Sequence, residues 1–189
     1  MRIAVFASGT GSNYRAIAEA AANGRLPQVE LALVLSDRQD APVLDKAAAD
    51  GVLHRFVDPK GYETKADYET KLLRILEEQR IDLIVLAGYM RIIGPTLLHV
   101  YRGSIINIHP SLLPSFPGKS GIADAFDYGV KITGATVHYV DDGIDTGPII
   151  AQEMIRITAN DTLATVTEKI HQIEHQLYPA VLAELTEKG

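Results

Sequence analysis

Asn107 and His109 lie near the end of a short apolar run, in the segment Ile106-Asn-Ile-His-Pro-Ser-Leu-Leu-Pro114. Because side chains alternate along a strand, both are expected on the same side of it. An Asn amide can donate to a developing oxyanion, and an imidazole can move a proton near neutral pH. The pair therefore predicts group-transfer or acid–base chemistry. The alternative interpretation is a polar strand end that runs into a proline-bracketed loop.

A carboxylate that could assist His109 lies in the segment Asp141-Asp-Gly-Ile-Asp-Thr-Gly147, whose glycines and acids are typical of a turn. An Asp in such a loop could orient the imidazole and favour its protonated form. The composition of this segment by itself predicts only a loop, and it leaves the pairing of an Asp with His109 open.

The segment Ser8-Gly-Thr-Gly-Ser-Asn13 lies between a predicted strand and a predicted helix. Its glycines let the backbone approach a ligand, and free N–H groups at a helix start attract an anion. The third glycine of a dinucleotide-binding loop would fall at Tyr14, so a single phosphate fits better. Two alternatives remain: a dinucleotide whose ribose meets Asp37, and a plain turn with Ser12 or Asn13 as the helix N-cap.

The segment His171-Gln-Ile-Glu-His175 matches the zinc-binding pattern H-x-x-E-H in a predicted helix. At about 100° per residue, Glu174 leans toward the apolar stripe of that helix and both histidines flank the stripe. No further acid is placed as an obvious third ligand, so we predict no metal site. Unless the helix is rotated and Glu174 lies at the surface, its carboxylate needs a partner such as a ligand amine, hydroxyl or cation. The remaining histidines are expected to be structural or at the surface: His54, His99 and His138.

Residues 89–95, Tyr-Met-Arg-Ile-Ile-Gly-Pro, follow a buried run, and Gly94-Pro95 can begin a short helix with proline at its first position. The exposed backbone of this loop could bind a flat polar heterocycle. The alternative is a plain connection between a strand and a helix.

Short apolar runs alternate with segments of helical period through about residue 110. The runs predict strands buried on both faces of a parallel sheet: residues 3–7, 29–35, 83–87 and 105–108, with a weaker strand at 53–57. The predicted helices are residues 13–22, 41–49 and 62–78. This order predicts an α/β fold with a Rossmann-like, doubly wound and mostly parallel sheet, which binds ligands at the carboxyl ends of its strands.

The second half of the chain changes character. Residues 131–140 and 148–157 are extended runs separated by a turn, which predicts an antiparallel hairpin at the sheet edge. A closing C-terminal helix is predicted over residues 162–187, with Asp161 as its cap and a kink at Pro179.

The composition excludes several classes of protein. The 189 residues carry 18 basic and 24 acidic side chains, a net charge of −6, and no cysteine, which excludes disulfide scaffolds, thiolate zinc sites and a cysteine nucleophile. The acidic balance argues against a nucleic-acid partner. No apolar run suits a membrane span or a signal peptide, so we expect no membrane partner and a cytoplasmic location. With no repeat or linker, residues 1–189 are predicted to form a single domain.

Four segments occur in an order that resembles the folate-dependent formyltransferase family, and within it the branch that formylates phosphoribosylglycinamide. They are Gly11-Ser-Asn13, Ala87-Gly-Tyr-Met-Arg91, Asn107 to Pro114 with the pattern Asn-x-His-Pro-Ser-Leu-Leu-Pro, and Asp141 to Gly147. The resemblance covers essentially the whole chain, and it implies a single formyltransferase domain.

The resemblance implies a role for each of these segments. The implied catalytic residues are Asn107, His109 and Asp145. The implied substrate-binding residues are Gly11, Ser12 and Asn13 at the phosphate and Glu174 at the ribonucleotide. The implied folate-binding residues are Met90, Arg91, Ile92, Ile93 and Asn107, with Lys65 near the folate tail, where relatives carry Arg. Residues 119–122 receive no role, and whether Leu113-Pro114 is cis is left open.

The implied reaction is direct formyl transfer from 10-formyltetrahydrofolate, a co-substrate, to the amine of phosphoribosylglycinamide, without a metal. A homodimer is compatible with this interpretation. Three alternatives are a formyltransferase acting on methionyl-tRNA, a hydrolase of formyltetrahydrofolate and a non-catalytic nucleotide-binding module. The first would need a further domain and a basic surface for tRNA, and the last would need only the first glycine loop.

Overall fold

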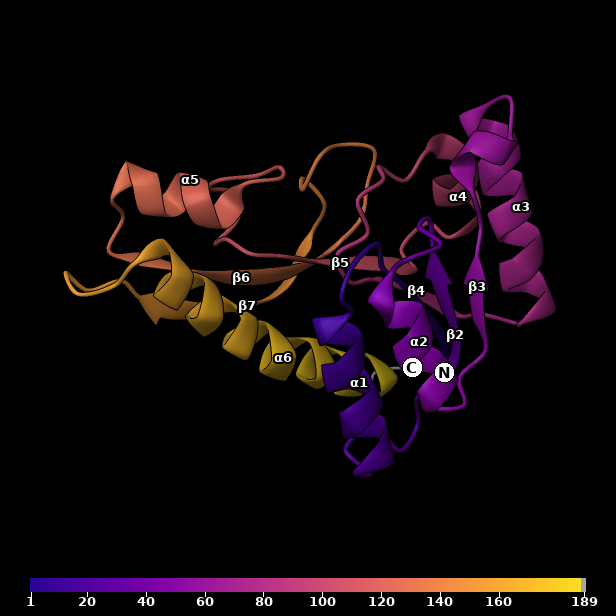
Figure 1. Cartoon of the computed structure of the whole chain (residues 1–189), viewed down its shortest axis with the longest axis horizontal. Helices are drawn as coiled ribbons and strands as arrows, with labels where there is room; N and C mark the ends of the chain where they lie inside the picture. The colour runs from indigo at the N-terminus through magenta and orange to yellow at the C-terminus, as the bar shows by residue number, and fades with distance from the viewer. Residues whose placement is uncertain (188–189) are drawn as a thin grey trace.

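The computed structural model describes residues 1–187, whose first half alternates strands and helices (Figure 1). The strands are β1 (Arg2–Phe6), β2 (Glu30–Ser36), β3 (His54–Phe56), β4 (Leu83–Leu86), β5 (Ile105–His109), β6 (Ile132–Tyr139) and β7 (Ile149–Arg156). The helices are α1 (Ser12–Ala22), α2 (Pro42–Ala49), α3 (Lys65–Glu78), α4 (Pro95–Val100), α5 (Gly121–Tyr128) and α6 (Leu163–Glu187), with a 3-10 turn η1 (Pro59–Gly61).

The strands form one sheet in the order β3-β2-β1-β4-β5-β6-β7. Strands β1 to β5 pair in parallel, and β6 and β7 add to β5 as an antiparallel hairpin. The predicted doubly wound, mostly parallel sheet with its C-terminal hairpin and closing helix is confirmed.

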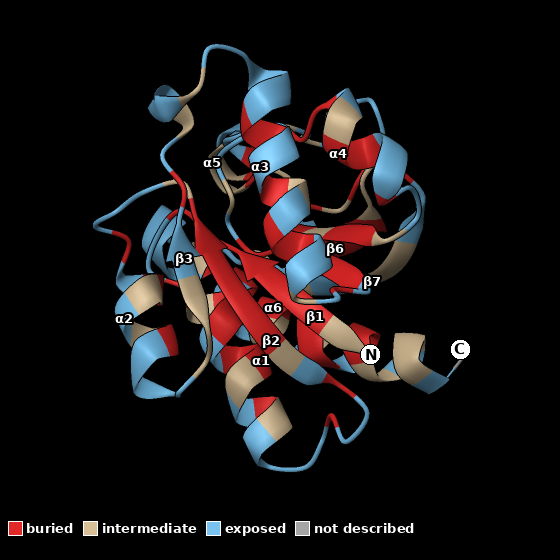
Figure 2. Cartoon of the chain, turned by 90° about the vertical axis from the view of Figure 1, so that its right-hand side faces the viewer, coloured by how far each residue is buried: buried red, intermediate tan, exposed pale blue. Residues whose placement is uncertain are grey.

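Two apolar cores cover the two faces of this sheet, because alternate residues of each central strand point to opposite sides. Ile3 and Val5 of β1 join a core with α1, α2 and α6, whereas Ala4 and Phe6 join a core with α3 and α4. Figure 2 shows β1 and β2 as buried strands between helices whose outer surfaces are exposed. The near-continuous apolar runs are therefore the sign of a sheet covered by helices on both faces.

The start of α3 and the cap of α6 differ from the sequence prediction. Helix α3 begins at Lys65 rather than at residue 62, because Thr64 and Asp67 form a reciprocal capping box. Helix α6 begins at Leu163, and the prediction of Asp161 as its cap is wrong. The Thr162 hydroxyl accepts from the Thr165 amide at 3.3 Å, whereas the Asp161 carboxylate accepts from the Thr158 amide and from Lys169.

Helix α5 is missing from the sequence prediction. Its eight residues bury only Gly121 and Ala125, two small residues that give no apolar stripe in the sequence.

The Leu113-Pro114 peptide bond, whose isomer the sequence left open, is cis. No helix within residues 1–187 is long and apolar enough to cross a membrane.

Candidate active site

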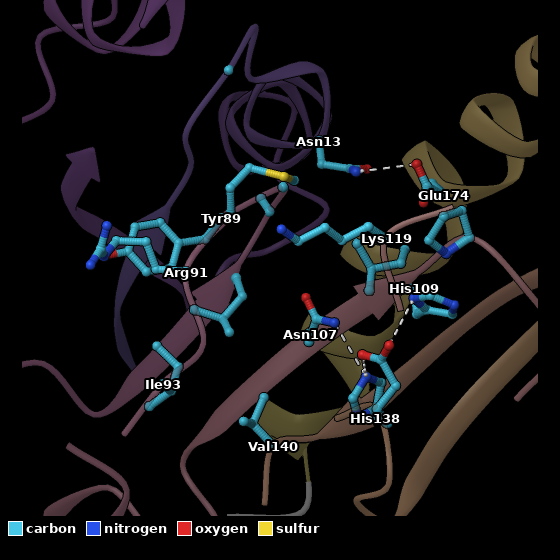
Figure 3. A pocket seen from close by; sticks show the side chains of 18 of the residues that line it. Asn13, Tyr89, Arg91, Ile93, Asn107, His109, Lys119, His138, Val140 and Glu174 are labelled. Carbon is cyan, nitrogen blue, oxygen red and sulfur yellow. Dashed lines mark hydrogen bonds and ion pairs between the residues drawn. The ribbon is translucent and has the colours of Figure 1, made fainter. Parts of the chain in front are cut away.

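A cavity of about 540 Å³ opens at the carboxyl ends of β1, β4 and β5 (Figure 3). Strand β1 lies between β2 and β4, so the strand order reverses there, which is where doubly wound sheets bind ligands. The walls come from the loop after β1, the loop after β4, the end of β5, the loop after β6, and α6. In Figure 3, Asn13 and Glu174 lie at one end of the cavity, Arg91 and Ile93 lie at the other, and Asn107 lies between them.

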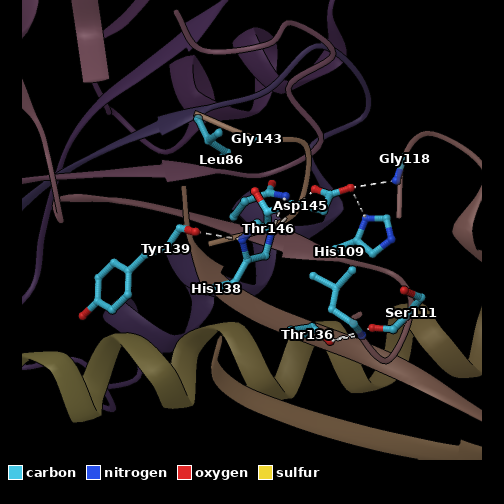
Figure 4. A network of polar contacts seen from close by, with 12 residues as sticks. Leu86, His109, Ser111, Gly118, Thr136, His138, Tyr139, Gly143, Asp145 and Thr146 are labelled. Carbon is cyan, nitrogen blue, oxygen red and sulfur yellow. Dashed lines mark hydrogen bonds and ion pairs between the residues drawn. The ribbon is translucent and has the colours of Figure 1, made fainter. Parts of the chain in front are cut away.

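Asp145 lies between two imidazole rings in the middle of the cavity wall (Figure 4). Its Oδ2 atom is 3.4 Å from Nδ1 of His109, and its Oδ1 atom is 3.6 Å from Nε2 of His138. The Gly118 amide donates to Oδ2 at 2.8 Å. The backbone of Asp145 is left-handed, with φ 55°, a conformation that Asp adopts more readily than most residues. The structure therefore pairs the loop carboxylate with His109, a contact that the sequence left open.

The surroundings of Asp145 favour its charged form. Burial by itself would raise the pKa of this carboxyl. The hydrogen bonds from His138 and the Gly118 amide, with the charges of His109 and His138, outweigh burial and lower the pKa below its usual value.

Both ring nitrogens of His109 face acceptors. Nε2 lies 2.8 Å from the Phe116 carbonyl oxygen, and Nδ1 faces the Asp145 carboxylate. A ring with a proton on each nitrogen donates to both groups at once. The ring is almost fully buried, so its direction is fixed by these two contacts and by the end of β5.

His138 is a site residue that sequence reasoning missed. The prediction of a structural or surface role is corrected here, because His138 lines the cavity beside Asn107. Its Nδ1 is 2.9 Å from the Tyr139 carbonyl oxygen, and its Nε2 faces both Asn107 Nδ2 at 3.2 Å and Asp145 Oδ1 at 3.6 Å. Asn107 and His138 are paired across β5 and β6, a register that the sequence does not reveal.

The loop before α1 offers unpaired backbone donors to the cavity. Gly11 is the N-cap residue in a left-handed conformation, with φ 70° and no side-chain cap, so the interpretation of Ser12 or Asn13 as the N-cap is wrong. Within residues 1–187, the amide N–H groups of residues 10–13 donate to no other group of the chain. Gly11, Ser12 and Asn13 all line the cavity, in an arrangement that suits an anion.

Glu174 closes the same end of the cavity from α6, on the core side, where helical periodicity predicted it. Its side chain is 5% exposed, and Oε2 accepts from Asn13 Nδ2 at 3.3 Å. Burial raises the pKa of Glu174 to about 7, although the Asn13 hydrogen bond lowers it. Asn13 Oδ1 is buried and has no partner within residues 1–187. A ligand hydroxyl or amine could donate to Asn13 Oδ1 and to the Glu174 carboxylate.

The two histidines of the zinc-like pattern do not converge with Glu174 on one point. His171 lines the cavity and stacks on His175, with ring centroids 6.4 Å apart. Burial, followed by the charge of His171, lowers the pKa of His175. Within residues 1–187, no group of three or more His, Asp or Glu side chains could hold a metal ion.

The loop after β4 forms the opposite end of the cavity. Met90 and Ile92 are 65% and 64% exposed, whereas Ile93 is buried. Ser8 holds this loop: its hydroxyl donates to Asp37 at 2.6 Å and accepts from the Met90 amide at 2.8 Å. The alternative of dinucleotide binding depended on Asp37 meeting a ribose. In the structure the Asp37 carboxylate accepts a hydrogen bond from Ser8.

Side chains of α3 hold the same loop from the other side. The Arg91 guanidinium lies 5.5 Å from the centre of the Tyr68 ring, and Glu69 accepts from the Gly94 amide at 2.5 Å. Lys65 is the first residue of α3 and lies next to Gly94, but it does not line the cavity.

Comparison with known proteins identifies the family. The family model described as formyl transferase matches residues 1–182. The chain belongs to the formyl transferase family. It is 48% identical to the phosphoribosylglycinamide formyltransferase of Bacillus subtilis, over 97% of this chain and 94% of that protein. It is also 38% identical to the human trifunctional purine biosynthetic protein adenosine-3, of which it spans 18%.

Solved structures of this formyl transferase family share the fold. The phosphoribosylglycinamide formyltransferase of Bacillus halodurans is 50% identical, with a TM-score of 0.94, over 98% of this chain and 95% of that chain. The glycinamide ribonucleotide transformylase 1 of Geobacillus kaustophilus is 53% identical, with a TM-score of 0.95, over 97% of each chain. The formyl transferase described here is therefore an enzyme of the same architecture.

Proposed function

We propose that this formyl transferase moves the formyl group of 10-formyltetrahydrofolate to the amine of phosphoribosylglycinamide, a step of purine biosynthesis. One observation carries the proposal: a single cavity joins an anion-binding loop, the Asn107, His109 and Asp145 cluster, and an exposed apolar loop. The names of the relatives support the same reaction. We further propose that residues 1–189 act as one formyltransferase domain, since the family model spans nearly all of them.

The acceptor is proposed to bind at the α1 and α6 end. The amide groups of Gly11, Ser12 and Asn13 would hold its phosphate, because they have free N–H groups at a helix start. Glu174 would accept from ribose hydroxyls. Such bonds stabilise the ionised carboxylate and so offset the cost of its burial.

The formyl donor is proposed to bind at the other end. The backbone between Met90 and Ile93 would read the polar edge of the folate ring, while the exposed Met90 and Ile92 side chains cover its faces. Lys65 would lie toward the acidic tail, where an ammonium group provides a point charge. Asn107 lies between the two ends, next to the position that the formyl group would occupy.

In the proposed reaction, the acceptor amine attacks the formyl carbon and forms a carbon–nitrogen bond. The Asn107 amide donates to the resulting oxyanion, and the positive charge of the protonated His109 ring beside it stabilises the negative charge, which lowers the barrier. Asp145 keeps His109 charged and oriented. The bond from the formyl carbon to N10 then breaks, and the proton lost by the amine ends on N10, giving the formylated ribonucleotide and tetrahydrofolate.

The decisive experiment supplies 10-formyltetrahydrofolate with three acceptors in turn: phosphoribosylglycinamide, charged initiator methionyl-tRNA and water. Turnover with the ribonucleotide alone supports the proposal. Turnover with tRNA or water would assign the chain to a different reaction of the same family. The net charge of −6 argues against tRNA, and we propose neither a nucleic-acid nor a membrane partner.

A His109→Ala variant separates an enzyme from a binding module. An enzyme loses turnover in this variant and keeps its ligand affinity. Absence of turnover with all three acceptors in the wild type, together with retained nucleotide binding, would favour a non-catalytic module.

A further inference from the structure

Helix α2 supports the anion-binding loop from behind, on the side away from the cavity. Nζ of Lys46 donates to the Thr10 carbonyl oxygen at 2.6 Å, and the Val43 amide donates to the Gly9 carbonyl oxygen at 3.3 Å. Gly11 lies directly against Val43, since a Cβ atom at position 11 would be 2.5 Å from Val43 Cγ2. Two successive carbonyl groups of the loop are therefore held by α2.

These contacts set the direction of the next amide groups. In a trans peptide unit, the C=O and N–H groups point in opposite directions. Because α2 takes the carbonyl groups of Gly9 and Thr10, the N–H groups of Thr10 and Gly11 point away from α2. Both residues line the cavity, and their N–H groups donate to nothing within residues 1–187.

A second observation points to a ligand at this loop. The Asn13 side chain is 8% exposed and lines the cavity, and its Oδ1 atom has no partner within the described chain. Unpaired donors and an unpaired buried acceptor thus meet at one place. A sugar phosphate offers both the anion and the hydroxyl groups that would satisfy them.

We propose that Lys46 is a positioning residue for the acceptor phosphate. Its ammonium group fixes the Thr10 carbonyl and thereby aims the Gly11 N–H at the phosphate, without touching the phosphate itself. Its positive charge also lies behind the amides that receive the anion, where it adds to the attraction of the helix start. This inference rests on the proposed function, since it assumes that the acceptor carries a phosphate at residues 11–13.

The test compares Lys46→Met with Lys46→Arg and with Lys71→Met, a control on α3 outside the cavity. Methionine keeps much of the length of the side chain but cannot donate, whereas arginine can still reach the Thr10 carbonyl. We expect Lys46→Met to raise the KM for phosphoribosylglycinamide about tenfold, at an unchanged KM for the formyl donor. Lys46→Arg should restore most of the affinity, and Lys71→Met should match the wild type.

A binding measurement without turnover separates this inference from the proposed function. Inorganic phosphate is titrated into each protein while the amide NMR signals of residues 10–13 are followed. The wild type should show saturable shifts at these residues, and Lys46→Met should need about tenfold more phosphate. If the wild type binds phosphate in this way, Lys46→Met weakens that binding, and the wild type transfers no formyl group, the proposed function fails while Lys46 still positions the anion-binding loop.

Three results would overturn the inference. They are an unchanged acceptor KM in Lys46→Met, an equal rise in both KM values with a lowered melting temperature, and wild-type amides that do not respond to phosphate. The second result would mean that Lys46 only stabilises the fold.

Discussion

Asn13 Nδ2 lies 3.3 Å from Glu174 Oε2, so α1 and α6 meet at the acceptor end of the cavity across 161 residues of sequence. This bond is the only hydrogen bond to the Glu174 carboxylate within residues 1–187. One amide donor does not offset the burial of a charge, and the pKa of Glu174 is therefore raised from 4.5 to about 7.

Glu174 should make folding stability depend on pH. Between pH 4.5 and about 7 the folded chain holds a proton on Glu174 that the unfolded chain has lost, so stability falls as the pH rises through this range. The shift corresponds to about 3 kcal/mol. The free energy of unfolding is measured in urea for Glu174→Gln and for the wild type. The variant should gain stability relative to the wild type by about this amount between pH 4 and pH 8. Glu168→Gln, on the exposed side of α6, is the control, and equal pH dependence in both variants would contradict the prediction.

Asp145→Asn should lower kcat by about a hundredfold or more, because it removes the charge that holds His109 protonated. The Gly118 amide can still donate to the new side chain, so the loop should keep its position. Steady-state rates between pH 5 and 9 are the measurement, with the exposed Asp142→Asn in the same loop as control. An unchanged rate and an unchanged pH profile would remove Asp145 from the mechanism.

Ser8→Ala should weaken binding of the formyl donor. The Ser8 hydroxyl holds the Met90 amide at 2.8 Å, so its loss frees the backbone proposed to read the folate ring. We expect the KM for the donor to rise about tenfold while the KM for the acceptor stays within about twofold. Ser104→Ala, outside the cavity, should behave as the wild type. A larger effect on the acceptor than on the donor would refute this role of Ser8.

Thr136→Val should destabilise the fold by about 2 kcal/mol. The fully buried Thr136 hydroxyl donates to the Ser111 carbonyl at 2.7 Å and accepts from the Leu113 amide at 3.1 Å, and so holds the turn after His109. Valine has the same shape and leaves both groups unpaired, and it also removes the hydroxyl that accepts from Gln152 Nε2 at 2.9 Å. The midpoint of urea unfolding measures the loss.

Thr133→Val is the matched control on the same strand. The Thr133 hydroxyl is buried and has no partner within residues 1–187, so its replacement should be neutral or stabilising. Equal losses in the two variants would show that the Thr136 hydrogen bonds contribute nothing.

Local patterns were sufficient for the layout of the protein apart from α5. Apolar runs such as that of β1 identified the strands, because a strand covered on both faces has no polar alternation. Helical spacing placed Glu174 on the core side of α6, and the turn residues around Asp145 identified a loop. Each of these features depends on residues close together in the chain.

Contacts between distant segments decided the rest. His138 joined the site because antiparallel pairing sets it opposite Asn107, and Asp145 met His109 because the loop after β6 folds over the end of β5. Lys46 reached Thr10 across 36 residues. These contacts depend on strand register and on how loops and side chains pack in the whole chain. The spacing of residues along the sequence does not predict them.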